Sequence, residues 1–363
     1  MAARHGKKKK RRSRRSPLQR LGRGLYSALV VVSAIIVGLW LGYKAASRRP
    51  GTAEPPPAPN TPIFTDDPST TDVDESQQGL QRKEATWTFL LAAEDQVSGS
   101  TDTIMVCTYD TVNQKIGLVS VPRDTVVDRE GWKYYKLNAA YSNGNFYDPP
   151  DGGIEQLKAA VGEIVGFPID HYVLIDTNIF VEIVNAVGGV DFDVPVYMNY
   201  DAPDQDLHIH YNPGWQHLNG KQALEVVRCR NNSDGPGQYP DNVYPAYPDL
   251  DIGRTRTQQE MVKTIAKKVL SNPQKVGSYV ELFSKYVKTD LTLGNMLWFV
   301  EPALKFNFDD LVTGTLPGDG GASYHGISVY ELDIEGSLEL INRCVNPYTT
   351  DITEDMVRMV RGD

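Results

Sequence analysis

The feature that most constrains this chain is an uncharged apolar segment near its N-terminus, from Gly24 to Tyr43. Its length matches the ~20 residues that an α-helix needs to cross a bilayer. Eleven Lys and Arg residues precede it and three follow closely, an asymmetry that keeps the N-terminus in the cytoplasm. We therefore expect a single-pass protein of the cell membrane, extracytoplasmic after Tyr43. The alternative is a cleaved signal peptide, but this segment is longer than a usual signal and a poor cleavage site follows it.

Charge is divided unequally along the chain. The first 50 residues hold 14 Lys and Arg and no Asp or Glu, so the remaining residues carry 23 basic and 46 acidic side chains. An acidic exterior part argues against nucleic acid as a partner, because nucleic acid binding depends on basic surfaces. The basic cytoplasmic tail, residues 1–23, is interpreted as a topology determinant that also contacts anionic lipid.

Composition divides the exterior part further. Residues 44–84 are rich in Pro, Thr, Ser and Asp and hold too few large apolar residues to bury a core. We predict a disordered extracytoplasmic linker there, between the membrane span of residues 24–43 and one globular domain over residues 85–345. Residues 346–363 are expected to be a C-terminal tail.

Within the domain, short apolar runs rich in β-branched residues alternate with segments of helical spacing. The predicted strands are Thr86–Ala93, Thr103–Tyr109, Ile116–Val121 and His171–Ile175. The predicted helices are Ile154–Val165, Ile179–Val187, Gln222–Val227 and Gln258–Leu270. Gly188-Gly189 would end a helix by supplying positive φ, and Val190 to Val194 alternates as the next strand. The pattern predicts a layered α/β domain.

Basic and amide side chains crowd into two short segments of this acidic domain. They are Arg228 and Arg230 in the first, and Arg254, Arg256, Gln258 and Gln259 in the second. Guanidinium groups keep their charge and bind phosphate oxygens in pairs, so clustered arginines indicate a polyanionic ligand. An isolated arginine is more often a solvated or salt-bridged surface group, and only the clustering favours a binding site.

Two carboxylates and a further arginine fall where predicted strands begin or end. Asp95 follows the first strand, Asp102 opens the second, and Arg123 lies just beyond the third, after Pro122. Ligand sites in open α/β sheets lie at such edges. Carboxylates beside arginines suit a Mg²⁺ and pyrophosphate site, in which hard oxygens hold the metal and arginines neutralise the phosphate. Taken singly, an Asp after a strand is usually a turn former or helix cap.

Several linked motifs resemble the LytR-CpsA-Psr (LCP) family in order and spacing, roughly over residues 86–270. They are Phe89 to Asp95, Thr101-Asp102-Thr103, Leu118 to Thr125, Lys136 to Tyr141, Ile169 to Asp176, Val187 to Val190, Gly214 to Arg230 and Asp251 to Gln259. The resemblance implies an α/β/α domain with a central mixed sheet and an apolar lipid pocket. Linked motifs are more specific than any one of them.

The resemblance also implies an activity. Such proteins are membrane-anchored phosphotransferases that move an anionic glycopolymer, teichoic acid or capsular polysaccharide, from a polyprenyl pyrophosphate carrier to peptidoglycan as a phosphodiester. The expected partners are therefore that lipid-linked polymer, peptidoglycan and the membrane. The expected cofactor is Mg²⁺, with Mn²⁺ as a substitute. The alternatives are a polyprenyl pyrophosphate hydrolase and a non-catalytic protein that binds wall polymers.

Residue by residue, the resemblance assigns roles to the polar positions already singled out. Asp95, Asp102 and Arg123 are expected to be catalytic, with the two acids as metal ligands, and which of them acts as a base stays open. The pyrophosphate-binding residues are expected to be Arg123, Arg228, Arg230, Arg254 and Gln258. Lys136 and Asp251 are expected to contact these residues and hold them in position without touching the ligand. The sequence departs from the family at Thr257, where an arginine is common, although Arg256 is adjacent.

Two further expectations concern the lipid and the thiols. The tail of the carrier needs an apolar tunnel, expected along His171 to Ile175 and Ile179 to Val187, although the same residues would suit an ordinary core. Cys107 lies in an apolar strand and is expected to be a buried thiol. Cys229 and Cys344 are then left to pair as a disulfide outside the cell.

Overall fold

The computed structural model describes residues 41–55, 80–94, 99–129, 132, 134–147, 152–202, 207–234 and 242–362. The predicted cytoplasmic tail, and the predicted membrane span up to residue 40, lie outside these ranges. Residues 41–46 form a helix that belongs to a separate N-terminal unit, and residues 49–363 form the main unit. No helix within the described ranges combines the length and the apolar character needed to cross a membrane.

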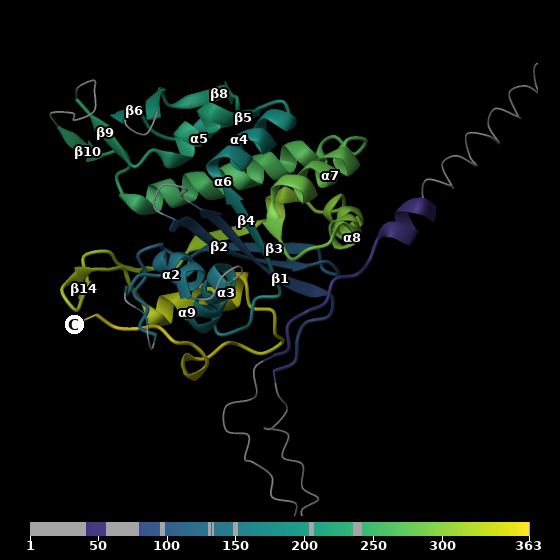
Figure 1. The fold of residues 1–363 in the computed structure, drawn as a ribbon, viewed down its shortest axis with the longest axis horizontal. Helices are drawn as coiled ribbons and strands as arrows, with labels where there is room; N and C mark the ends of the chain where they lie inside the picture. Colours follow the sequence, from purple (N-terminus) through teal and green to yellow (C-terminus); the bar gives the residue numbers. More distant parts are fainter. Residues whose placement is uncertain are drawn as a thin grey trace, which may run out of the picture. The chain divides into compact units, whose positions relative to one another are not determined.

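A six-stranded mixed sheet forms the centre of the main unit, in the order β11-β4-β1-β2-β3-β12 (Figure 1). Its strands are β1 (Thr86–Glu94), β2 (Thr101–Asp110), β3 (Lys115–Ser120), β4 (His171–Asp176), β11 (Lys288–Thr289) and β12 (Val312–Thr315). β1 pairs antiparallel with β2 and parallel with β4, and β3 pairs antiparallel with β2 and parallel with β12. The four predicted strands and the mixed α/β class are therefore confirmed.

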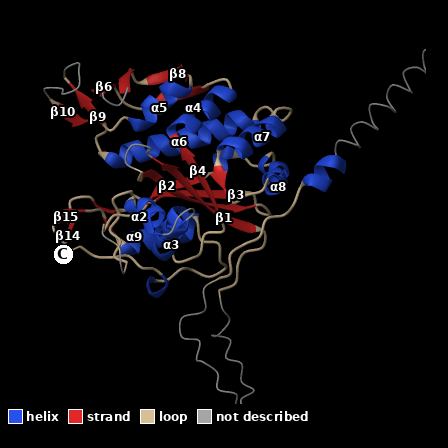
Figure 2. Cartoon of the chain, viewed as in Figure 1, coloured by secondary structure: helices blue, strands red, loops and turns tan. Residues whose placement is uncertain are grey.

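Helices cover both faces of this sheet, as Figures 1 and 2 show. One face carries α2 (Ala139–Tyr147), α3 (Gly152–Val165) and α9 (Ile334–Cys344). The other carries α4 (Thr177–Ala186), α5 (Gly220–Arg228), α6 (Asp251–Leu270), α7 (Val276–Tyr286) and α8 (Leu293–Ala303). In α3, Leu157, Val161 and Ile164 repeat at helical spacing and are buried against the sheet. Gly188 and Gly189 have positive φ after α4, as predicted.

Short strands form an outer layer beyond α4 and α5. They are β5 (Val190–Val194), β6 (Met198–Ala202), β7 (Leu207–Tyr211), β8 (Gly214–Leu218), β9 (Asn231–Ser233) and β10 (Val243–Pro245). The remaining short elements are β13 (Gly318–Asp319), β14 (Ser323–Tyr324), β15 (Ile327–Ser328), β16 (Glu331–Leu332), η3 (Phe308–Asp310) and η4 (Glu354–Met356). Among the strands β5 to β10, the sequence pattern predicted only β5.

The C-terminal part of the chain completes the domain. β12 extends the central sheet, and α9 packs on the face that α3 also covers. Residues 346–362, expected to be a tail, contribute Tyr348 and Ile352 to the same core, and the Arg358 backbone donates to Glu163. The structure therefore places this segment in the fold, because its apolar side chains fill space beneath α3.

The expected linker also contacts the domain at both of its described ends. At the C-terminal end, the Lys83 N–H donates to the Pro347 carbonyl and the Arg82 guanidinium pairs with Asp170. At the N-terminal end, the Ala53 N–H donates to Asp170 at 2.6 Å. Residues 49–55 and 80–84 are thus docked segments, whereas composition predicted disorder throughout residues 44–84; residues 56–79 lie outside the described part.

Candidate functional site: an anion clamp and an apolar cavity

The N-terminus of α6 supplies the most deeply buried charge of the candidate site. α6 begins at Asp251, seven residues before the predicted start at Gln258, so Arg254 lies in its first turn. The Arg254 side chain is 9% exposed, and its Nη2 lies 3.0 Å from Asp251 Oδ2. The preceding residue, Leu250, has φ of 56° and no side chain caps the helix. An uncapped helix N-terminus leaves N–H groups and a positive dipole end that favour an anion.

The edge of the central sheet supplies a second group of charges. β2 begins and β3 ends at the same edge because the two strands are antiparallel, with Met105 opposite Ser120. Arg123 therefore lies beside Asp102, and its Nη1 donates to Asp102 Oδ1 at 2.6 Å. The prediction that Asp102 and Arg123 meet at one sheet edge is confirmed; Asp95, predicted at the same edge, lies outside the described residues.

Electrostatic interactions join the two groups. Burial lowers the pKa of Arg254, Asp251 opposes this effect, and the nearby positive charges of Arg123 and Arg230 lower the pKa further. Burial also acts to lower the pKa of Arg123, but nearby carboxylates, Asp102 first, outweigh it and raise the pKa overall. The Arg230 Nε lies 3.7 Å from Asp251 Oδ1. We call these five residues, Asp102, Arg123, Arg230, Asp251 and Arg254, the anion clamp.

The clamp contains buried donors that the described residues do not satisfy. The Nε atoms of Arg123 and Arg254 are both buried, and neither has a hydrogen-bond partner in the described ranges. The hydroxyl of Thr101, the residue before Asp102, is also buried and has no hydrogen-bond partner in the described ranges. Buried donors are nearly always paired in native proteins, and an unpaired one costs about 1–3 kcal/mol. Two guanidinium groups with unsatisfied Nε atoms in one place indicate a site for an oxyanion.

The other predicted site residues lie around this clamp or outside the described ranges. Arg228 ends α5, and the Gln258 side-chain amide donates to the carbonyl of its neighbour Val227 at 3.3 Å. The Lys136 ammonium lies 3.2 Å from Asp124 Oδ1, and Asp124 also lies 4.0 Å from Arg123 Nε. Lys136 thus supports Arg123 through Asp124, which sequence reasoning missed. Asp95 lies outside the described residues, directly after the end of β1.

Gln259 and Arg256 have roles that the sequence did not reveal. Gln259 is buried, and its amide donates to Ser120 Oγ at 2.7 Å and to the Gly314 carbonyl at 2.6 Å. It therefore ties α6 to β3 and β12 and fixes the first turns of α6 beside the sheet edge. Arg256 is exposed and pairs with Asp249 instead of a clamp residue.

An apolar cavity of about 390 Å³ lies between the central sheet and the helices that cover it. Val173 of β4 and Ile183 of α4 line it, as the sequence predicted. The other walls come from strands β1 to β3 and from α6, α7 and α8, with Phe89, Ala266 and Phe299 among them. All of the lining residues are aliphatic or aromatic, and the volume falls within the usual range for small-molecule pockets. The cavity suits a hydrocarbon chain.

The clamp residues are compatible with a divalent metal that shares the ligand's oxygens. The described residues hold no group of three or more His, Cys, Asp or Glu that could enclose a metal ion alone. Mg²⁺ in phosphate sites commonly uses one or two carboxylates, with phosphate and water oxygens as its remaining ligands. Asp102, which commits its Oδ1 to Arg123, is the described carboxylate suited to this role.

The predicted disulfide is wrong, because all three cysteines are free thiols. Cys229 is buried in the core cluster beneath α5 and α6, whereas Cys344 packs with α3 and α9 on the other face of the sheet. The sheet therefore separates the two sulfur atoms. Burial raises the pKa of both Cys107 and Cys229 to about 12, so these two are inert thiols at neutral pH.

Together, fold and site define an α/β protein with clustered arginines at the first turn of α6 and an apolar cavity along the last turns of the same helix. The model of the LytR_cpsA_psr family matches residues 62–344, and the chain belongs to that family. This agrees with the resemblance that the motifs indicated.

Two named relatives come from Bacillus species. The chain is 31% identical over 202 residues to the polyisoprenyl-teichoic acid–peptidoglycan teichoic acid transferase TagV of Bacillus subtilis, covering 54% of this chain and 46% of TagV. It is 29% identical over 273 residues to the corresponding transferase TagU of Bacillus anthracis, covering 73% of this chain and 79% of TagU.

Solved structures share the fold. The crystal structure of B. subtilis TagV matches with a TM-score of 0.58 at 25% identity, over 72% of this chain and 96% of that one. A structure of TagT bound to LI-WTA matches with a TM-score of 0.53 at 20% identity, over 72% and 89% of the two chains.

Proposed function

We propose that the protein transfers an anionic glycopolymer of the teichoic acid type from a polyprenyl pyrophosphate carrier to peptidoglycan. The relatives TagV and TagU are named as transferases of this kind. The observation that carries the proposal is the pairing of a buried guanidinium clamp with an apolar cavity, because the carrier joins a pyrophosphate to a hydrocarbon chain. α6 takes part in both, since Arg254 lies in its first turn and Ala266 lines the cavity.

In the proposed reaction, a peptidoglycan hydroxyl attacks the phosphorus that carries the polymer. A new P–O bond forms, the P–O bond to the polyprenyl phosphate breaks, and that phosphate leaves with the electron pair. Arg254, Arg123 and Arg230 stabilise the charge that develops on the phosphate oxygens, which is the main task of a protein in phosphoryl transfer. The proton of the attacking hydroxyl passes to a carboxylate, Asp95 or Asp102, whichever of the two does not hold the metal.

Mg²⁺ is the proposed cofactor, with Mn²⁺ as a substitute, and it would neutralise the pyrophosphate while Asp102 or Asp95 holds it. We also propose that residues 24–43 anchor the protein in the cell membrane, with residues 1–23 in the cytoplasm and the domain outside. The lipid carrier and the peptidoglycan acceptor then lie on the same side of the membrane as the clamp.

The experiment combines purified full-length protein, Mg²⁺, a polyprenyl pyrophosphate-linked oligosaccharide and a peptidoglycan oligomer. Oligosaccharide joined to the oligomer through a phosphodiester supports the proposal. Release of the oligosaccharide phosphate without the acceptor indicates a hydrolase, and binding without turnover indicates a wall-polymer-binding protein. Chelation by EDTA, followed by Mg²⁺ or Mn²⁺, tests the metal. Asp102→Asn should abolish transfer, whereas Asp191→Asn, a matched change of an exposed acid that pairs with His217, should not.

The apolar cavity has its own test. Ala266 lines the cavity from α6, so Ala266→Trp should fill part of it and raise the KM for a long-chain carrier. A short-chain carrier, which needs less of the cavity, should be affected much less. Glu260→Trp places the same ring on an exposed position of the same helix that does not line the cavity, and it is the matched control. Equal effects of both substitutions on long-chain carriers would contradict the assignment.

A further inference from the structure

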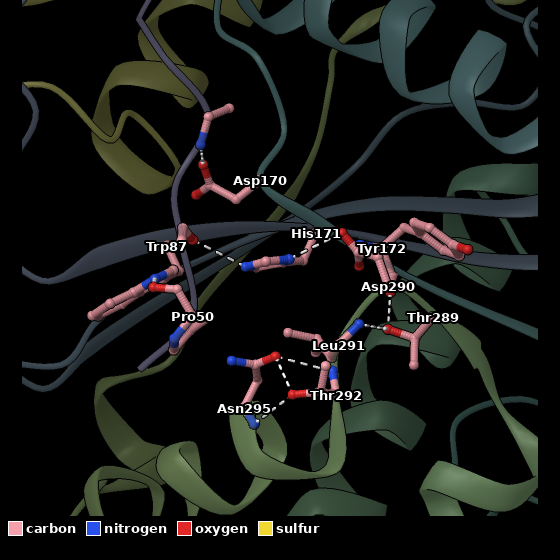
Figure 3. A network of polar contacts seen from close by, with 12 residues as sticks. Pro50, Trp87, Asp170, His171, Tyr172, Thr289, Asp290, Leu291, Thr292 and Asn295 are labelled. Carbon is pink, nitrogen blue, oxygen red and sulfur yellow. Dashed lines mark hydrogen bonds and ion pairs between the residues drawn. The ribbon is translucent and has the colours of Figure 1, made fainter. Parts of the chain in front are cut away.

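Residues 49–55, which we call the strap, lie against the edge of the central sheet. The Trp87 indole N–H donates to the Pro50 carbonyl at 3.4 Å, and the Arg49 guanidinium lies 5.2 Å from the centre of the same ring. The His171 Nε2 lies 3.1 Å from the Gly51 carbonyl oxygen. Figure 3 shows this network, with Pro50 beside Trp87 and the His171 ring next to the strap backbone. A segment with a tether's composition is thus held by specific contacts.

Asp170 holds the other end of the strap. It accepts the Ala53 N–H at 2.6 Å, and it also accepts the Thr88 N–H at 2.7 Å and pairs with Arg82. The Asp170 side chain is fully buried. Hydrogen bonds to a buried carboxylate are charge-assisted and stronger than neutral ones. The strap is therefore anchored to a residue whose position β1 already fixes.

The strap contacts lead directly to α8. The His171 Nδ1 lies 3.0 Å from Asp290 Oδ2, and Asp290 also accepts the Tyr172 N–H at 3.0 Å, just before α8 begins (Figure 3). The His171 ring thus lies between the strap backbone and Asp290. On the other side, the Trp87 ring packs on Trp298 of α8, with ring centres 4.8 Å apart.

α8 has apolar residues on two neighbouring faces, about 100° apart around the helix. Met296, Phe299 and Ala303 follow at helical spacing and line the apolar cavity. Leu293 and Leu304, at 44% and 43% exposure, lie on the outward face, with Leu297 and Val300 between them at helical spacing. A continuous apolar stripe on a surface helix normally packs against another apolar surface or enters lipid. The outward face of α8 therefore calls for an apolar environment.

The chain length limits where this face lies in the cell. The predicted membrane span ends at Tyr43, and the strap begins six residues later at Arg49. A fully extended chain reaches ~3.3–3.6 Å per residue, so the strap begins at most about 20 Å from the span. A freely disordered linker of residues 44–84 would instead allow a separation of more than about 130 Å. The docked strap thus shortens the effective tether to a few residues.

We propose that the outward face of α8 rests on the lipid bilayer and that the strap holds it there. Leucine side chains of a surface helix enter the boundary between headgroups and acyl chains, where they lose contact with water. The wall of the apolar cavity would then lie against the membrane, and an isoprenoid chain would enter the cavity without crossing open water. This inference rests on the membrane anchor and the lipid-linked substrate of the proposed function.

The test uses the full-length chain in vesicles of phosphatidylglycerol and phosphatidylethanolamine. A fluorophore is attached at Leu304→Cys, or at Trp215→Cys as the control, in a Cys344→Ser background. Trp215 is 75% exposed and lies on β8, well away from α8 (Figure 1). Spin-labelled lipids should quench the label at position 304 several-fold more strongly than the label at position 215. Equal quenching at the two positions would overturn the proposal.

A second arm releases the strap without touching the domain. The double variant Arg49→Ala, Ala53→Pro removes the cation above Trp87 and the N–H that Asp170 accepts. Glu54→Pro, which places the same ring one residue further on, is the matched control. Quenching at position 304 should fall to the level of the control position in the double variant and persist in Glu54→Pro. Equal quenching in both strap variants would show that the strap does not hold the domain.

Two further readouts keep the result interpretable. In the unlabelled wild-type chain, hydrogen exchange of residues 293–304 should be several-fold slower in lipid nanodiscs than in solution. In nanodiscs, the double strap variant should exchange these residues faster than the wild type. Exchange that lipid leaves unchanged in the wild type would count against the proposal. A water-soluble, short-chain donor should be turned over equally with and without the docked strap, whereas a vesicle-embedded long-chain carrier should react several-fold more slowly without it. Failure with both donors in the wild type would refute the proposed function, while failure of quenching alone refutes this inference.

Discussion

Arg254→Lys is the most informative single change, because it keeps the positive charge and removes only the guanidinium geometry. The Arg254 Nη2 contacts both oxygens of Asp251, at 2.9 and 3.0 Å, which leaves Nη1 and the buried Nε for a ligand. A lysine ammonium is a single point charge on a flexible stem. It can stay with Asp251 or reach the phosphate, and it reproduces at most one of these interactions well.

The expected loss follows from the hydrogen bonds removed. A hydrogen bond to a charged group contributes about 1.5–3 kcal/mol, so losing one in the transition state lowers kcat/KM roughly ten- to hundredfold. Burial adds to the effect, because a 9% exposed side chain leaves little room for water to replace the missing donors. The free energy of unfolding should change by less than the activation free energy, since the contact with Asp251 can persist.

The assay is steady-state transfer of a lipid-linked oligosaccharide to peptidoglycan, with thermal unfolding measured on the same samples. Arg256→Lys is the matched control: it lies two residues along α6, is 59% exposed, and pairs with Asp249 instead of the clamp. We expect kcat/KM within about twofold of wild type for the control, as for other exposed ion pairs of small energy. If Arg254→Lys retained full turnover, or if both variants lost activity equally, the role given to the buried guanidinium would be refuted.

Three further predictions concern stability and thiol chemistry. Gln259→Leu removes the side-chain N–H groups that donate to Ser120 Oγ and to the Gly314 carbonyl. It should lower the free energy of unfolding by about 1–3 kcal/mol, as measured by denaturant titration. The matched control Gln258→Leu should lower it by less. Cys107 and Cys229, with pKa values raised to about 12 by burial, should resist iodoacetamide at pH 8 until the protein unfolds; rapid labelling of the native protein would contradict their burial. Burial alone would raise the pKa of Asp290, but hydrogen bonds from His171 and the Tyr172 N–H outweigh it and lower the pKa overall. The contribution of Asp290 to stability is therefore fully present above its unfolded-state pKa and is lost as pH falls through its folded-state pKa. Asp290→Asn should therefore destabilise the protein near neutral pH and weaken the loss of stability in acid, as thermal unfolding between pH 3 and 7 would reveal.

The sequence predicted the central sheet well and the start of α6 poorly, for a physical reason. Strands such as β1 and β4 are continuous runs of β-branched and large apolar residues, a signal that survives without tertiary context. The first turns of α6 are polar and contain Gly253, which has low helix propensity. Packing stabilises them instead: a Cβ at Gly253 would lie 2.5 Å from the Tyr247 ring, so only glycine allows this close approach.

The sequence predicted the parts of the candidate site that lie at strand ends. It did not predict which side chains of α6 face the sheet. Asp102 and Arg123 meet because two antiparallel strands share an edge, which follows from the order of the strands. Gln258 and Gln259 are adjacent in sequence but point about 100° apart on a helix, and which one faces the sheet depends on packing. The strap was not predictable, because its Gly51 and Ala53 contacts use backbone atoms that carry no sequence signal.

α6 explains how the clamp and the cavity can serve one ligand. Arg254 lies in its first turn and Leu270, its last residue, lines the apolar cavity. With a rise of 1.5 Å per residue, these two positions are about 24 Å apart along a rigid rod. The distance between the clamp and this wall of the cavity is thus set by one helix, which Gln259 fixes to the sheet. Under the proposed function, a ligand with only one of the two parts would lose either the charge interactions or the apolar burial, which is why we expect a pyrophosphate with a long isoprenoid to bind best.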